Sequence, residues 1–221
     1  MSGGAVVRPS VAVPEEQVIR YTFPERVGHW INGIAYTYLL ATGLALFTPH
    51  MYWLAAVLGG GPTIRFWHPW MGVLYMITIF WMHSTWKKDM VTTAEDREWQ
   101  KHMKDYVENR DDKMPPQHRF NAGQKQFWWV MFYASLILLL TGIVMWFPEE
   151  VPPGVHWVLP IVVFIHSATA LITIAGFLIH VYMSVFVTPG SMKGMLDGQV
   201  SADWARTHHR LWYEKITGRR K

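Results

Sequence analysis

Four long stretches of the chain contain no Asp, Glu, Lys or Arg, and this feature limits the possible folds more than any other. The stretches are centred on residues 30–48, 67–86, 127–147 and 158–187. Each is long enough for a helix to cross a hydrocarbon core of roughly 30 Å, and the fourth is longer, so we expect it to tilt or protrude. Because backbone polar groups must be satisfied inside lipid, the sequence predicts an all-α membrane protein, a four-transmembrane-helix bundle.

The 20 Lys and Arg residues lie mostly in two segments. The connection 87–125 holds nine and the tail after residue 187 holds seven, whereas 49–66 and 148–157 together hold one. Positively charged segments flanking membrane helices stay in the cytoplasm, so both termini and the 87–125 connection are predicted to be cytoplasmic. The formal net charge of +4 is then a topology signal, and no nucleic-acid partner is expected beside the membrane lipid.

Two further features define the domain organisation. Residues 1–18 form a polar N-terminal extension, polar enough to be disordered and without the apolar core of a signal peptide, and residues 19–221 form the membrane domain. The chain has no cysteine, which excludes iron–sulfur clusters, disulfides and thiolate haem ligands of its own.

Four histidines lie inside or at the ends of the apolar stretches. His166 and His180 are fourteen residues apart, a rise of roughly 21 Å along one helix, and they lie within roughly 40° of each other around it. With the predicted topology, His68 shares the outer level with His166, and His29 shares the inner level with His180. Neutral imidazoles paired at two depths predict two bis-histidine haems, one at each level.

Other interpretations of these histidines stay open from the residues alone. One intramembrane histidine can be a polar residue satisfied by its neighbours, a zinc site would lack carboxylate or thiolate partners, and a proton pathway would lack an intramembrane acid. His83 also reaches the inner level and competes with His29 as the partner of His180. The other histidines are expected at the interface or in solvent: His50, His102, His118, His156, His208 and His209.

A polar motif precedes the third apolar stretch. Asn121, Gly123, Gln124 and Lys125 offer side-chain and backbone donors next to Phe127, and a quinone carbonyl needs such donors beside an apolar slot. The same residues suit a helix start with Asn121 as the N-cap. The residues themselves do not separate a quinone site from a cap.

Over roughly residues 19–215 the chain resembles the cytochrome b (gamma) subunit of respiratory membrane-bound formate dehydrogenase. Cytochromes b of nickel–iron hydrogenases share the haem arrangement, but the motif before the third stretch favours the formate branch. The resemblance rests on Gly28-His29-Trp30, His68-Pro69, Asn121-Ala122-Gly123-Gln124-Lys125, Ile165-His166, Leu178-Ile179-His180-Val181-Tyr182-Met183, Gly190-Ser191-Met192-Lys193-Gly194-Met195 and Trp204-Ala205-Arg206-Thr207-His208-His209.

The resemblance implies two b-type haems, the inner held by His29 and His180 and the outer by His68 and His166. It implies a quinone, menaquinone or ubiquinone, near the inner haem at residues 121–125, and no catalytic residue or formate-oxidising site on this chain.

The resemblance also implies partner subunits and a cellular location. These are an iron–sulfur (beta) subunit, a molybdenum or tungsten catalytic (alpha) subunit, the bacterial inner membrane and an oligomer of the complex. Electrons are expected to run from the iron–sulfur subunit through the outer and inner haems to quinone near the cytoplasmic face. The alternatives are the cytochrome b of a nickel–iron hydrogenase or other periplasmic oxidoreductase, or a haem-free membrane anchor.

Overall fold

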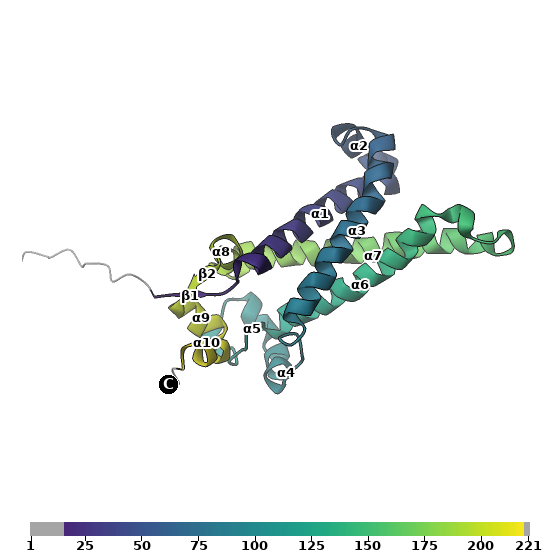
Figure 1. The fold of residues 1–221 in the computed structure, drawn as a ribbon. Coiled ribbons are helices and arrows are strands. Elements are labelled where there is room, and N and C mark those ends of the chain that lie inside the picture. Colours follow the sequence, from purple (N-terminus) through teal and green to yellow (C-terminus); the bar gives the residue numbers. More distant parts are fainter. Residues whose placement is uncertain (1–15, 219–221) are drawn as a thin grey trace, which may run out of the picture.

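Four long helices dominate the computed structural model, which describes residues 16–218 (Figure 1). They are α1 (Phe23–Phe47), α3 (Gly61–Trp86), α6 (Ala122–Trp146) and α7 (Leu159–Tyr182). The chain of α7 continues through a π-helical turn, Met183–Val187. α1 packs along α3 and α6 packs along α7, with fewer contacts between these two helical hairpins, whose tips lie well apart.

The helices begin earlier than the charge-free stretches suggested. Pro24 stands in the first turn of α1, where Thr22 and Glu25 form a capping box, so the helix starts at Phe23 and not near residue 30. α3 starts at Gly61, directly after Gly60 with its positive φ of 93°. His29 and His68, expected at helix starts, therefore lie one to two turns inside their helices.

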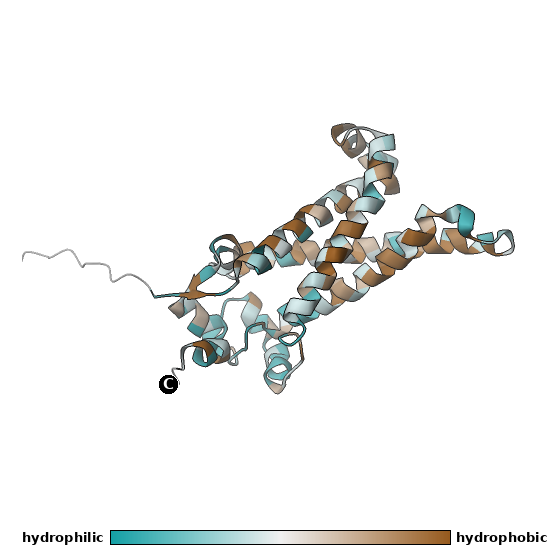
Figure 2. Cartoon of the chain, viewed as in Figure 1, coloured by the Kyte–Doolittle hydropathy of each residue, from teal (hydrophilic) through white to brown (hydrophobic). Residues whose placement is uncertain are grey.

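The surface of the long helices is apolar, as a lipid environment requires. Among the described residues, three segments are long and apolar enough to cross a membrane: Phe23–Phe47, Ala122–Trp146 and Pro153–Val187. The last has the highest mean hydropathy of the three, yet only 11% of its most apolar window is buried. Apolar residues, drawn in brown, recur along the long helices in Figure 2. Side chains with this distribution face lipid, so the chain is a helical membrane protein. α3 has 26 residues but is not among the three segments, and the four-span count stays a prediction.

Short elements cover both ends of the bundle. We call the end that contains most of the Lys and Arg residues the basic end. It carries β1 (Gln17–Ile19), α4 (Ala94–Lys101), α5 (Met103–Val107), η2 (Asp111–Lys113), α8 (Ser191–Asp197), β2 (Gln199–Ser201), α9 (Ala202–His208) and α10 (Arg210–Thr217). The other end, called the opposite end, carries η1 (Pro49–Met51), α2 (Trp53–Val57), η3 (Pro148–Glu150) and η4 (Pro153–Val158).

A two-stranded sheet holds both ends of the described chain together at the basic end. β1 pairs antiparallel with β2, with Gln17 opposite Ser201. Residues 16–18 of the expected polar extension are thus ordered, which corrects the prediction for them, and residues 1–15 lie outside the described part.

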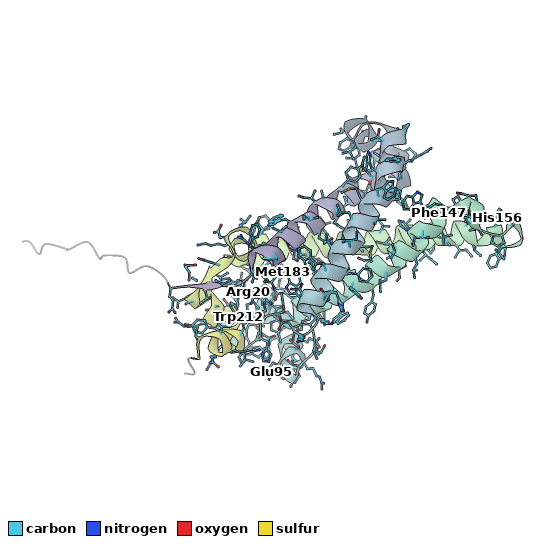
Figure 3. All side chains as sticks on the ribbon, viewed as in Figure 1. Arg20, Glu95, Phe147, His156, Met183 and Trp212 are labelled. Carbon is cyan, nitrogen blue, oxygen red and sulfur yellow. The ribbon has the colours of Figure 1, made fainter. Side chains whose placement is uncertain are left out.

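A buried arginine and histidine join these segments, and here the expectation of a solvated His209 is wrong. His209 is 1% exposed, its Nδ1 donates to the carbonyl of His118 (2.7 Å), and its Nε2 accepts from Arg20 Nη2 (3.1 Å). The Arg20 guanidinium lies 4.7 Å from the ring centre of Trp212, and both residues are labelled at the basic end in Figure 3. Burial, with the neighbouring Arg20 cation, holds the pKa of His209 well below its ordinary value of 6.5.

Candidate functional site

Two histidines from different hairpins face each other in the half of the bundle nearer the basic end. His29 of α1 and His180 of α7 have ring centres 6.2 Å apart, and we call them the inner pair. A metal ion bound about 2 Å from one nitrogen of each imidazole places the ring centres about 6 Å apart. His29 Nδ1 is buried and has no hydrogen-bond partner among the described residues. The separation suits one iron held between the two rings.

His68 of α3 and His166 of α7 form the outer pair, and each ring is anchored by a threonine from the neighbouring helix. Thr42 Oγ1 lies 2.7 Å from His68 Nδ1, and Thr141 Oγ1 lies 2.8 Å from His166 Nδ1. Because these bonds occupy Nδ1, the second ring nitrogen, Nε2, is left for a metal.

His83 does not join the inner pair. Its ring stacks on Phe132 of α6 (4.5 Å between ring centres, 26° between planes) and lies parallel to that of Trp128 (6.3 Å, 10°). The histidine that the structure brings to His180 is therefore His29, and His83 belongs to the aromatic packing between α3 and α6. Which histidines bind iron stays a prediction.

The arrangement in pairs suits haem and not zinc. Among the residues that the structure describes, no three His, Cys, Asp or Glu side chains cluster as metal ligands. A pair of imidazoles would be enough to hold a haem, because the porphyrin supplies the other ligands of its iron, whereas a structural zinc ion takes four protein ligands. His166 and His180 lie in the uninterrupted helix α7, so the rise of roughly 21 Å between the two levels holds.

The residues predicted to bind quinone form the first turn of α6, and the cap geometry is present there. Asn121 Oδ1 accepts from Gln124 N–H (2.9 Å), and Gln124 Oε1 accepts from Asn121 N–H (3.0 Å). Asn121 Nδ2 donates weakly to the hydroxyl of Tyr106 (3.4 Å). The amide group of Gln124 keeps its donors available, and the N–H of Gly123 is one of the first-turn groups that a helix leaves unpaired.

Lys125 and Phe127 point to different faces of α6. Its Nζ donates to Asp96 Oδ2 (2.7 Å) and to the carbonyl of Val91 (2.9 Å), and both charged side chains are at most 4% exposed. Phe127 instead stacks on the ring of His180 (4.6 Å, 7°). A cavity of about 240 Å³ lies on the Lys125 side, lined also by Asp96, Gln100 and Trp129. The ammonium of Lys125 is thus committed to Asp96 and Val91, while Gly123 lies against Trp99 of the same helix α4.

Sequence reasoning missed Thr42, Thr141 and Asp96. The two threonines carried a signal, because each is followed by glycine and then Leu or Ile, and each precedes an outer-pair histidine by 26 or 25 residues. Asp96 carried none, since it lies in a charged connection 29 residues before Lys125.

Long apolar helices that carry histidines at two levels, with His29 and His180 facing each other at the inner one, define a class, the helical membrane proteins that hold haem between their helices. A family model described as prokaryotic cytochrome b561 matches residues 20–198. The chain belongs to this family, and haem b is the cofactor that the family implies.

Formate dehydrogenase subunits are among the similar proteins, and the resemblance to them is confirmed. The cytochrome b556 subunit of the Haemophilus influenzae formate dehydrogenase is 32% identical over 207 residues, covering 91% of this chain and 84% of that protein. The cytochrome b556(Fdn) subunit of the nitrate-inducible formate dehydrogenase of Escherichia coli is 29% identical, covering 91% and 92%. The cytochrome b556(fdo) subunit from the same species is 28% identical, covering 91% and 94%.

Proposed function

We propose that this chain is the di-haem cytochrome b subunit of a bacterial formate dehydrogenase in the inner membrane. It spans the membrane four times with the basic end in the cytoplasm. In this role it accepts electrons from an iron–sulfur partner at the opposite end and delivers them to quinone near the basic end. Formate oxidation belongs to a molybdenum or tungsten partner subunit.

The proposal is carried by histidines from two hairpins that lie at two levels of the bundle and that face each other at the inner level. The inner pair has a ring separation of 6.2 Å, and the outer pair has its Nδ1 atoms already bonded. Haem, when bound, supplies an iron that changes its charge by one electron. The protein holds the two positions roughly 21 Å apart along one rigid helix, within apolar surroundings that exclude water.

The quinone site is proposed at the first turn of α6, beside the inner pair. Asn121, the N–H of Gly123 and the Gln124 amide are the donors toward a quinone carbonyl, and Phe127, stacked on His180, supplies an apolar wall. Lys125 is not one of these donors in the proposal, because its ammonium is already bonded to Asp96 and to the carbonyl of Val91. The proposal thus assigns Lys125 to holding the helix start in place.

Replacement of His166 tests the proposed electron path. His166→Ala in the intact complex should lower the haem content from two per chain to one. It should also abolish formate-driven quinone reduction, while formate oxidation with a soluble dye survives in the partner. His156→Ala is the matched control, because His156 lies exposed at the same end and, within residues 16–218, bonds the carbonyl of Val151 and no histidine or threonine of the site. Two haems per chain in the His166→Ala variant would contradict the assignment of His166 as a haem ligand. If the intact complex reduces quinone with molecular hydrogen and not with formate, the chain is a hydrogenase subunit.

Two substitutions of Asn121 separate a quinone ligand from a helix cap. Asn121→Ser keeps an oxygen that caps α6 but removes the amide donor, whereas Asn121→Ala removes both. Weaker quinone or inhibitor binding in both variants, with both haems retained, supports a site. A loss confined to Asn121→Ala indicates that the residue serves as the cap alone.

A further inference from the structure

The outer pair is held by the same hydrogen-bonded arrangement twice. In the first hairpin Thr42 of α1 bonds His68 of α3, and in the second Thr141 of α6 bonds His166 of α7. The sequence repeats with the structure: Thr42-Gly43-Leu44 matches Thr141-Gly142-Ile143, and the spacing to the histidine is 26 residues in one hairpin and 25 in the other. The two halves of the outer site are thus built alike.

The helix backbone offers each of these two threonine hydroxyls an acceptor for its proton. Thr42 Oγ1 donates its only proton to the carbonyl of Tyr38 (2.8 Å), and Thr141 Oγ1 donates to that of Ile137 (2.6 Å). With the hydroxyl proton on that carbonyl, each oxygen accepts from its histidine, and the imidazole donates from Nδ1–H. In this tautomer Nε2 carries the lone pair, which is the form that binds a metal ion.

The inner pair lacks such support on at least one side. His29 Nδ1 is buried and finds no acceptor within the described residues. A hydrogen bond from the distal nitrogen raises the basicity of an imidazole ligand, and a more basic ligand stabilises the more highly charged, oxidised iron. With iron on Nε2 of His29, as at the outer level, the two levels present ligands of different strength.

We propose that Thr42 and Thr141 are positioning residues of the outer haem site. They fix the tautomer and ring orientation of His68 and His166, and they lower the midpoint potential of the outer haem relative to the inner one. Electrons arriving at the opposite end then move downhill toward the basic end. This inference rests on the proposed di-haem function and adds the residues that set its direction.

Redox titration of the intact, detergent-purified complex tests the proposal. Thr42→Val and Thr141→Val replace the hydroxyl by a methyl group of nearly the same shape, and haem content, the ferric haem spectrum and both midpoint potentials are measured for each. The outer haem is identified as the one missing from His166→Ala. Thr37→Val is the matched control, because Thr37 Oγ1 makes the same bond to a backbone carbonyl four residues earlier (Gly33, 2.8 Å), but Thr37 is exposed and has no hydrogen bond to a described histidine.

The expected result is a rise in the outer potential in both valine variants, or about tenfold or greater loss of outer haem affinity. The inner potential should not change, and Thr42→Ser, which keeps the acceptor, should behave as the parent chain. Unchanged potentials with both haems retained, or an equal shift in Thr37→Val, overturn the proposal while leaving the di-haem function intact. Absence of haem from the parent chain instead overturns the proposed function itself.

Discussion

The ion pair of Asp96 and Lys125 should hold the connection between α3 and α6 against the bundle. Lys125 is 4% and Asp96 is 2% exposed, and their charged atoms are 2.7 Å apart. Asp96 Oδ2 also accepts from the N–H (2.7 Å) and the hydroxyl (3.2 Å) of Thr93 at the start of α4. Asp96→Ala therefore strands a buried cation and removes the Asp96 half of the capping box of α4.

The magnitude follows from these two losses. Removing one partner of a buried pair costs about 3–5 kcal/mol, and losing a cap costs about 1 kcal/mol. Because Lys125 keeps its bond to Val91 O, we expect about 4 kcal/mol, near the lower end of the sum. At about 1.4 kcal/mol for each factor of ten, amide exchange through local opening of residues 91–107 should accelerate roughly a thousandfold.

Hydrogen exchange read by mass spectrometry on the purified complex measures this directly. Glu98→Gln is the matched control on the same helix, since the Lys101–Glu98 pair is as short (2.6 Å) but its side chains are 69% and 49% exposed. An exposed pair contributes at most about 1 kcal/mol. The double variant Asp96→Asn with Lys125→Met should recover most of the loss, because neither charge is then stranded. Equal effects of Asp96→Ala and Glu98→Gln would refute the reasoning.

Three further predictions concern the packing and the basic end. His83→Phe should retain both haems and their spectra, because His83 stacks between aromatic residues of α6; loss of one haem would show that it is a ligand. Lowering the pH below about 6.5 should increase amide exchange in residues 199–218. Below that pH His209 gains a proton in the unfolded state, whereas the buried ring of the folded state, with its depressed pKa, does not. Exchange that is independent of pH, after correction for the intrinsic rate, would contradict this. Gly198→Ala should loosen the same segment by about 1–3 kcal/mol, because φ is +85° and a Cβ would lie 3.0 Å from Tyr21 O, whereas Gly154→Ala should change little.

The sequence predicted the long helices and the histidine levels because both depend on local composition and helix rise. His166 and His180 are related by helix geometry alone. The same helix geometry could have predicted that His83 does not lie on the face of His68. The residue fourteen positions after His68 is Met82, and one further residue turns the side chain by about 100° around the helix. That rotation aims His83 toward α6.

Contacts between distant segments could not be predicted in this way. A stretch without charges marks where a helix is apolar, not where it begins, so the capping box at Thr22 and the start at Gly61 were missed. The burial of His209 depends on Arg20, which is 189 residues away. A charged connection likewise gives no sign that Asp96 will be buried against Lys125.

The haem content of the purified chain with its partners tests the central claim most directly. Pyridine haemochrome quantification and a reduced-minus-oxidised spectrum should give two b-type haems per chain, falling to one when His68 or His166 is replaced by alanine. His29→Ala or His180→Ala should remove the other haem. A protein without haem, or one whose haem content is unchanged in all four variants, would contradict the account.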